Sequence, residues 1–130
     1  MTTLPETKAC KVNIENEWLT ISFNQPEKRN ALTSELTDDI KNIFDAARDD
    51  LGVRGVTMRG EGGIFCAGGD LKMFKTGFQG GEQGMKDVEE ASALTGAFFD
   101  MINSYPKPVV MLAEGAAMAG GLGMLCAGDI

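Results

Sequence analysis

The pattern of hydrophobic and polar positions predicts a β-hairpin near the start of the chain. Apolar residues alternate with polar residues through 18–23, and a shorter strand-like segment covers 12–15. The two segments flank Asn16-Glu17, as strands flank the turn of a hairpin. The polar segment 24–30, which includes one proline, then predicts that the chain leaves the sheet in a surface loop.

Two further segments have the periodicity of amphipathic helices. In the first, Thr33 is placed to cap the helix, apolar residues through Ala47 fall on one face, and Gly52 marks the end. In the second, residues 85–104, apolar side chains recur every three or four positions, and the pattern stops just before a proline.

Short strands and glycine-rich segments complete the pattern. Apolar strands are expected at 55–59 and 109–113. Between Gly77 and Gly84, four glycines stand among polar residues, which indicates a mobile surface segment, not a packed element, that could gate a pocket. Residues 115–128 carry no charge, but their length and glycine content favour a buried turn and helix over a membrane span.

Taken in order, these elements predict one α/β domain. Strand, helix and glycine loop occur twice, and no linker divides residues 1–130 into separate domains. The 130 residues are 43% hydrophobic and 24% charged, with 4 prolines, which is the composition of a packed globular protein and not of a disordered chain.

The net charge restricts the choice of ligand. A formal charge of -7 argues against a general nucleic-acid binder, because neutralising phosphates requires clustered lysine and arginine. An anionic ligand would therefore be held locally. The candidate positive groups are Lys28, Arg29 and Lys72, together with helix N-termini, where backbone N–H groups point outward.

Cysteine and histidine usage restricts the chemistry further. Three cysteines, Cys10, Cys66 and Cys126, and an N-terminus without the features of a signal peptide predict reduced thiols in a cytoplasmic protein. The sequence has no histidine, which excludes a Ser-His or Cys-His pair within these residues, and no metal site is expected. We therefore expect Cys66 to be a small buried residue and not a nucleophile.

Two glycine loops are the candidate chemical groups. Gly68-Gly69 and Gly120-Gly121 lack Cβ at sharp turns, so their backbone N–H groups can approach a ligand. If the loops converge, one N–H from each could stabilise the oxyanion or enolate formed when a thioester reacts. From spacing alone, ordinary turns or tight helix packing are the more frequent explanation of such glycines.

Three motifs occur in the order found in the crotonase (enoyl-CoA hydratase/isomerase) superfamily. Residues 65–72, FCAGGDLK, resemble its first oxyanion loop, and the stretch from Lys107 through Gly121 resembles the second. Residues 29–32, RNAL, resemble its early coenzyme A loop. The resemblance extends from Val12 onward and implies a spiral of ββα units, of which residues 1–130 would form the N-terminal part, incomplete without the C-terminal part.

The resemblance also implies roles for particular residues. The N–H groups of Gly69 and Gly120 would form the oxyanion hole. Coenzyme A would enter as part of an acyl-CoA substrate, with no separate cofactor, bordered by Lys28 or Arg29, Ala31, Ala67, Leu71 and Lys72. For Lys28 and Arg29, a solvated surface loop is an equally good interpretation. The complete protein would form a homotrimer or a dimer of trimers, and this part alone would expose apolar surface.

Hydration of an α,β-unsaturated acyl-CoA is the first activity that the resemblance implies. Two-glutamate hydratases carry their first catalytic glutamate at the position of Gly123, so this chain cannot supply the full pair, and the acid-base residue is expected beyond Ile130. Isomerisation, thioester hydrolysis, dehalogenation and a non-catalytic acyl-CoA-binding scaffold all stay open. A dinucleotide site is disfavoured, because no G-x-G-x-x-G follows the first strand.

The other candidate side chains have structural interpretations. Asp70 is expected to cap the next helix, and Glu114 to satisfy backbone donors or face solvent. Asp129 carries no implied chemistry. Packing roles are expected for Met111, Met118, Met124, Trp18 and Tyr105.

Overall fold

The computed structural model describes residues 3–130. Its elements follow in the order β1 (Cys10–Glu15), β2 (Trp18–Phe23), the 3-10 helix η1 (Pro26–Lys28), α1 (Ser34–Ala47), β3 (Gly55–Gly60), β4 (Ile64–Cys66), α2 (Leu71–Gln79), α3 (Gly81–Asn103), β5 (Val109–Leu112), β6 (Ala116–Ala117) and α4 (Gly120–Ala127). The hairpin, both expected strands and the alternation of strands with helices are confirmed. The first helix ends at Ala47, earlier than expected, because the residues before Gly52 form separate turns.

The strands form two sheets. The main sheet has the order β1-β2-β3-β5, in which β1 and β2 are antiparallel and β3 runs parallel to both neighbours. β4 and β6 form a separate parallel pair, with Ile64 opposite Ala116 and Cys66 opposite Ala117. Because β4 leads into the first glycine loop and β6 into the second, this short ladder brings the two loops together.

The hydrophobic core takes side chains from both the main sheet and the helices. Buried members include Leu19, Ile21, Phe23, Leu36, Ile40, Phe44, Val56, Met58, Phe98, Ile102, Val109 and Met124. Met111 and Met124 are buried as predicted, but the prediction for Met118 is wrong, since it is 59% exposed. Met118 follows the two-residue strand β6, and only its backbone is engaged there: its N–H donates to Cys66 O, and its carbonyl oxygen accepts the N–H of Gly121.

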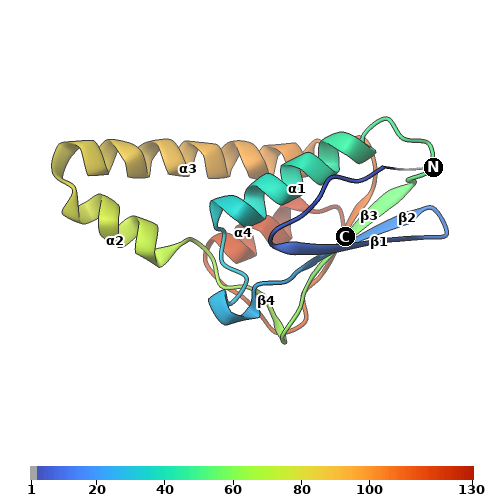
Figure 1. Ribbon diagram of the computed structural model, residues 1–130, viewed down its shortest axis with the longest axis horizontal. Coiled ribbons are helices and arrows are strands. Elements are labelled where there is room, and N and C mark those ends of the chain that lie inside the picture. The colour runs from blue at the N-terminus through green and yellow to red at the C-terminus, as the bar shows by residue number, and fades with distance from the viewer. Residues whose placement is uncertain (1–2) are drawn as a thin grey trace.

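The expectation of a mobile segment at residues 77–84 is wrong. These residues end α2 and begin α3, and Figure 1 shows the two helices as a pair that extends away from the sheet. Gly77 and Gly84 are buried where the helices touch, and a Cβ on Gly84 would lie 2.0 Å from the carbonyl oxygen of Gly77. The glycines at this point permit close helix packing, which their sequence pattern alone does not distinguish from mobility.

Two side chains from the α3–β5 connection cap the C-terminal end of α1. The hydroxyl of Tyr105 donates to the carbonyl oxygen of Phe44 at 2.6 Å, and Lys107 Nζ donates to those of Ala47 and, at 2.6 Å, Asp50. These bonds add side-chain donors at the end of the helix, where the regular backbone pairing stops. Ala47 O also accepts the N–H of Asp50, and Asp50 O accepts that of Val53. Tyr105 is therefore a packing residue, as predicted, with a specific polar contact.

No helix within residues 3–130 is both long enough and apolar enough to cross a membrane.

Tyr105 is predicted to make folding stability fall at alkaline pH. Burial raises its pKa from 10.0 to about 12. Between these two pH values, the unfolded chain loses the phenolic proton whereas the folded chain keeps it. The contribution of Tyr105 to the free energy of unfolding is therefore complete below pH 10 and is lost as the pH approaches 12. Tyr105 is the single tyrosine of the sequence, so tyrosinate absorbance reports this residue alone. The prediction would be contradicted if the tyrosinate absorbance titrated with a midpoint near pH 10 while circular dichroism showed the protein to be folded.

Candidate functional site

The first glycine loop can approach the second because Gly68 has no side chain. Gly68 has φ +104°, and a Cβ there would lie 2.9 Å from Met118 O and 3.3 Å from Gly120 N. An L side chain would be strained in this conformation and would also collide with the second loop. The contact is therefore specific to glycine.

The second loop turns sharply at Ala119, which has φ 49° and ψ −120° and precedes α4. Gly121, in the first turn of α4, packs so tightly that a Cβ would lie 2.2 Å from the carbonyl oxygen of Cys66. The same oxygen accepts the N–H of Met118 at 3.0 Å. The start of α4 is thus set directly against the end of β4.

The two candidate oxyanion residues, Gly69 and Gly120, lie side by side. The nitrogen of Gly69 is 3.8 Å from the place that a Cβ on Gly120 would occupy. Within residues 3–130, neither N–H donates to a protein acceptor. Gly120 is also the first residue of α4, where N–H groups carry partial positive charge. Two unpaired donors in this arrangement can bind a carbonyl oxygen or an anion.

Both glycines line one cavity of about 300 Å³. The remaining walls come from the loop before α1 and from α2 and α3, and they are largely apolar: Leu32, Asp70, Met73, Phe74, Ala91, Ser92, Thr95 and Ala119. The ring of Phe74 covers Gly69, since Phe74 Cε2 is 2.5 Å from the position of a Cβ on that glycine. The free donors therefore face a space suited to an apolar group with one polar end.

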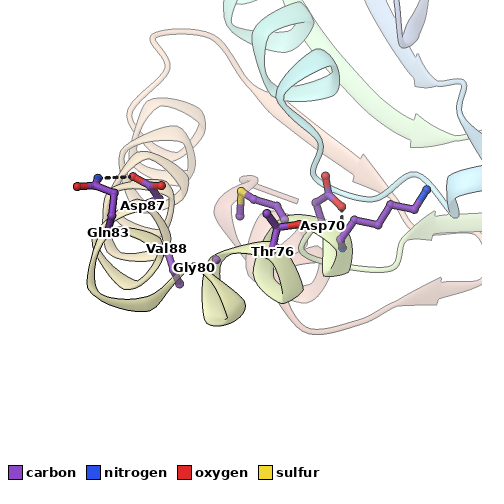
Figure 2. Close-up of a pocket in the computed structure, with 10 residues that line it drawn as sticks. Asp70, Thr76, Gly80, Gln83, Asp87 and Val88 are labelled. Carbon is purple, nitrogen blue, oxygen red and sulfur yellow. Dashed lines mark hydrogen bonds between the residues drawn. The ribbon is translucent and has the colours of Figure 1, made fainter.

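A second cleft, of about 470 Å³, lies between α2 and α3. Figure 2 shows Thr76 and Gly80 on one side and Gln83, Asp87 and Val88 on the other, with Gln83 Nε2 donating to Asp87 Oδ1 at 3.0 Å. Asp70 and Met73 line this cleft as well as the smaller cavity, so the first turn of α2 separates the two spaces.

The residues expected to border coenzyme A are grouped around the first glycine loop. Arg29 O accepts the N–H of Ala67 at 3.0 Å, and Leu32 N donates to Gly68 O at 2.7 Å. Lys28, the last residue of η1, and Arg29, which follows it, are exposed, and Ala31 is half-buried nearby. Leu71 and Lys72 are exposed in the first turn of α2. The structure brings these residues to one region, and their contact with coenzyme A stays a prediction.

The acidic residues near the loops have structural partners. Asp70 caps α2 as predicted, with its side chain accepting from Lys72 N at 3.1 Å. Glu114 is largely exposed, as expected, and also pairs with Arg59 at 3.3 Å, a contact that the sequence did not suggest. Asp129 accepts from Val109 N at 2.8 Å. No group of three metal-binding side chains is found among residues 3–130.

Cys66 is fully buried, as predicted. Burial raises the pKa of its thiol, which disfavours the thiolate that nucleophilic attack requires. Cys66 contributes its carbonyl oxygen to the site through the contacts with Met118 and Gly121 described above.

Sequence reasoning assigned no role to Phe74 or Phe99, and it noted Asn30 only as part of the coenzyme A loop motif. Phe99 faces Gly123, and a Cβ on that glycine would lie 2.8 Å from Phe99 Cε2. Phe74 and Phe99 follow the apolar periodicity of ordinary helical core residues, which carries no sign of a site. Asn30 did carry a signal, because asparagine in a loop often adopts the left-handed backbone conformation.

Comparison with known proteins identifies the family. The model of the enoyl-CoA hydratase/isomerase family matches residues 18–130, and this chain belongs to that family, within the crotonase superfamily. A Bacillus subtilis (strain 168) protein named "Probable enoyl-CoA hydratase" is 37% identical over 93 residues, which are 72% of this chain and 34% of that protein. A Thermus thermophilus protein, provisionally named as an enoyl-CoA hydratase, is 33% identical over 120 residues, or 92% and 46% of the two chains.

Solved structures confirm the crotonase-type α/β fold. An enoyl-CoA hydratase from Polaromonas sp. JS666 superposes with a TM-score of 0.82 at 32% identity, covering 95% of this chain and 47% of that one. AtuE of Pseudomonas aeruginosa gives a TM-score of 0.82 at 30% identity, covering 95% and 46%. The chain thus spans less than half the length of these relatives, in agreement with the expected correspondence to part of the family fold.

The contact between the loops predicts opposite effects for two glycine-to-alanine substitutions. Gly121→Ala places a Cβ against the backbone of Cys66 and should lower the free energy of unfolding by about 1–3 kcal/mol. Gly96→Ala is the matched control, because its Cβ would meet nothing within 4 Å on the exposed side of α3, and it should stabilise by about 0.5–1 kcal/mol. Urea denaturation measures both, and equal midpoints for the two variants would refute the packing argument.

Proposed function

We propose that the N–H groups of Gly69 and Gly120 form an oxyanion hole that polarises the thioester carbonyl of an acyl-CoA. The observation that carries the proposal is the pair of adjacent, unpaired donors on one largely apolar cavity. A carbonyl oxygen placed between the two donors gains negative charge as an enolate or tetrahedral adduct forms. The donors are held in place before the reaction, so they stabilise the charge without reorganising.

The coenzyme A portion would lie along the loop of residues 28–32 and the first turn of α2. Lys28, Arg29 and Lys72 supply positive charge for its phosphates in a chain whose net charge is -7. Ala31 and Ala67 are small, which leaves room for the ligand beside the backbone, and the exposed side chain of Leu71 offers apolar surface. The acyl group would extend from the two N–H groups into the cavity of about 300 Å³ that Gly69 and Gly120 line.

The reaction we propose is hydration of an α,β-unsaturated acyl-CoA. Several related proteins carry hydratase names, and the thioester carbonyl of an enoyl-CoA is conjugated with the double bond that water attacks. Polarising the carbonyl draws electron density from the β-carbon, and the resulting enolate is then protonated at the α-carbon. The residue that activates water is not assigned to Asp70, because its carboxylate caps α2.

Hydration is tested with the full-length protein and a panel of short and branched enoyl-CoAs. The ultraviolet absorbance of the conjugated thioester should decrease as water adds across the double bond. The same panel incubated with heat-unfolded protein serves as the control. Unchanged absorbance across the panel would remove hydration from the candidate reactions.

The role of the second donor can be tested at Gly120, the first residue of α4. Replacing the Ala119–Gly120 amide by an ester, with glycolic acid at position 120, removes the N–H without adding a side chain and should lower kcat on the order of 10²–10³-fold. Gly120→Ala is the control that keeps the N–H and adds a Cβ, which would lie 3.0 Å from Leu32 Cδ1 and 3.8 Å from Gly69 N. Equal kcat values for the two variants would rule out an N–H contribution from Gly120.

A second candidate is an oxyanion hole used for another reaction, or for acyl-CoA binding without catalysis. Gly123 favours this candidate, because it offers no carboxylate and Phe99 occupies the adjacent space. Thioester hydrolysis, dehalogenation and double-bond migration would each require a reactive group elsewhere. Tight coenzyme A binding in calorimetry with no turnover of any thioester would support the non-catalytic scaffold.

We also propose that the full-length protein assembles as a homotrimer or a dimer of trimers. Large apolar side chains are exposed on the helical pair and on α4, including Phe78, Leu94 and Leu122. In the proposed assembly, other subunits would cover these exposed apolar side chains.

A further inference from the structure

We propose that Asn30 is a positioning residue that holds the coenzyme A loop against the first glycine loop. The inference rests on the proposed function and deepens it by naming the side chain on which the shape of the coenzyme A site depends. Asn30 is not placed in contact with the ligand. It would act through the residues on either side of it.

The side chain of Asn30 is fully buried and makes three hydrogen bonds. Its Oδ1 accepts the N–H of Gln25 at 2.9 Å, and its Nδ2 donates to the carbonyl oxygens of Glu61 at 3.1 Å and Ile64 at 2.9 Å. Gln25 lies just before η1, which leads into the coenzyme A loop, whereas Glu61 and Ile64 flank the turn between β3 and β4. One amide group thus connects the loop to the strand that leads into the first glycine loop.

The residues beside Asn30 carry this connection to the glycine loop itself. Arg29 O accepts the N–H of Ala67 at 3.0 Å, and Leu32 N donates to Gly68 O at 2.7 Å. Leu32 and Gly69 also form an isolated parallel bridge. Movement of residue 30 would therefore shift both Arg29, a candidate phosphate ligand, and the backbone next to the proposed donor Gly69.

The backbone at this position explains why the residue is asparagine. Arg29 and Asn30 have φ of 54° and 51°, so two successive residues are left-handed. Asparagine adopts this conformation more readily than most residues, and its short amide supplies a donor and an acceptor together. Aspartate has nearly the same shape, but its carboxylate has no N–H for the carbonyl oxygens of Glu61 and Ile64.

The contrast between asparagine and aspartate provides the experiment. In Asn30→Asp, two carbonyl oxygens lose their donor and face a carboxylate, so the loop should separate from the β3–β4 turn. We expect coenzyme A affinity to fall about tenfold, and kcat/KM to fall mainly through a higher KM. Asn30→Gly keeps the left-handed backbone accessible and removes the side-chain bonds, so it should have a similar effect if Asn30→Asp fails to fold.

Asp39→Ala is the matched control. Asp39 is also buried, and its Oδ2 accepts the N–H groups of Lys8 and Ala9 at 2.9 and 2.6 Å, so this variant also loses buried hydrogen bonds, but in the N-terminal segment. Coenzyme A binding is measured by calorimetry at a temperature where all variants are folded. Hydrogen exchange at Ala67 and Leu32 reports the pairing of the loops, and it should accelerate in the Asn30 variants alone.

The outcomes separate the inference from the proposed function. If wild-type protein binds no coenzyme A, the proposed function fails and the role of Asn30 fails with it. If wild-type protein binds but Asn30→Asp and Asn30→Gly bind equally well, only the role of Asn30 is overturned. An equal loss of affinity in Asp39→Ala would also overturn it, because reduced global stability would then account for the effect.

Discussion

The direct backbone contact between the two glycine loops is the constraint on which the rest of the site depends. A Cβ at Gly68 would meet Met118 O at 2.9 Å, and one at Gly121 would meet Cys66 O at 2.2 Å. The opposing atoms belong to backbone that is itself paired, so they cannot move aside as the end of a side chain can. The contact therefore determines where α4 begins, and with it the distance between the N–H groups of Gly69 and Gly120.

Because the candidate donors are backbone groups, the proposed function has two separable parts, polarisation of the carbonyl and proton transfer. Any thioester carbonyl can accept hydrogen bonds from two N–H groups, whatever the acyl chain. Proton transfer requires a particular side chain near the reacting carbon, and neither Gly123 nor the capping residue Asp70 is available for it. The proposed donors therefore leave open which reaction follows polarisation of the carbonyl.

The other glycines in the chain serve a different purpose. Gly77 and Gly84 allow α2 and α3 to pack closely, and this helical pair lines both cavities. Met73 faces both spaces, so a shift of α2 relative to α3 would change them together. The same residue type therefore supplies candidate backbone donors in one place and close helix contact in another, depending on what lies opposite.

The sequence by itself determined the features that depend on near neighbours along the chain. Alternation predicted the hairpin, Thr33 was placed as the cap that accepts Leu36 N, and Asp70 was placed as the cap of α2. The candidate glycines and the coenzyme A loop followed from their resemblance to motifs of the superfamily. Each of these signals is contained in a few consecutive residues.

Only the tertiary structure decided what lies opposite each residue. It packed residues 77–84 into two helices, exposed Met118, and placed Phe99 against Gly123. It also buried Asn30 among carbonyl groups more than thirty positions away. A glycine or an asparagine has the same local preferences in every protein, and its role is set by the distant backbone that strand pairing and helix packing bring beside it.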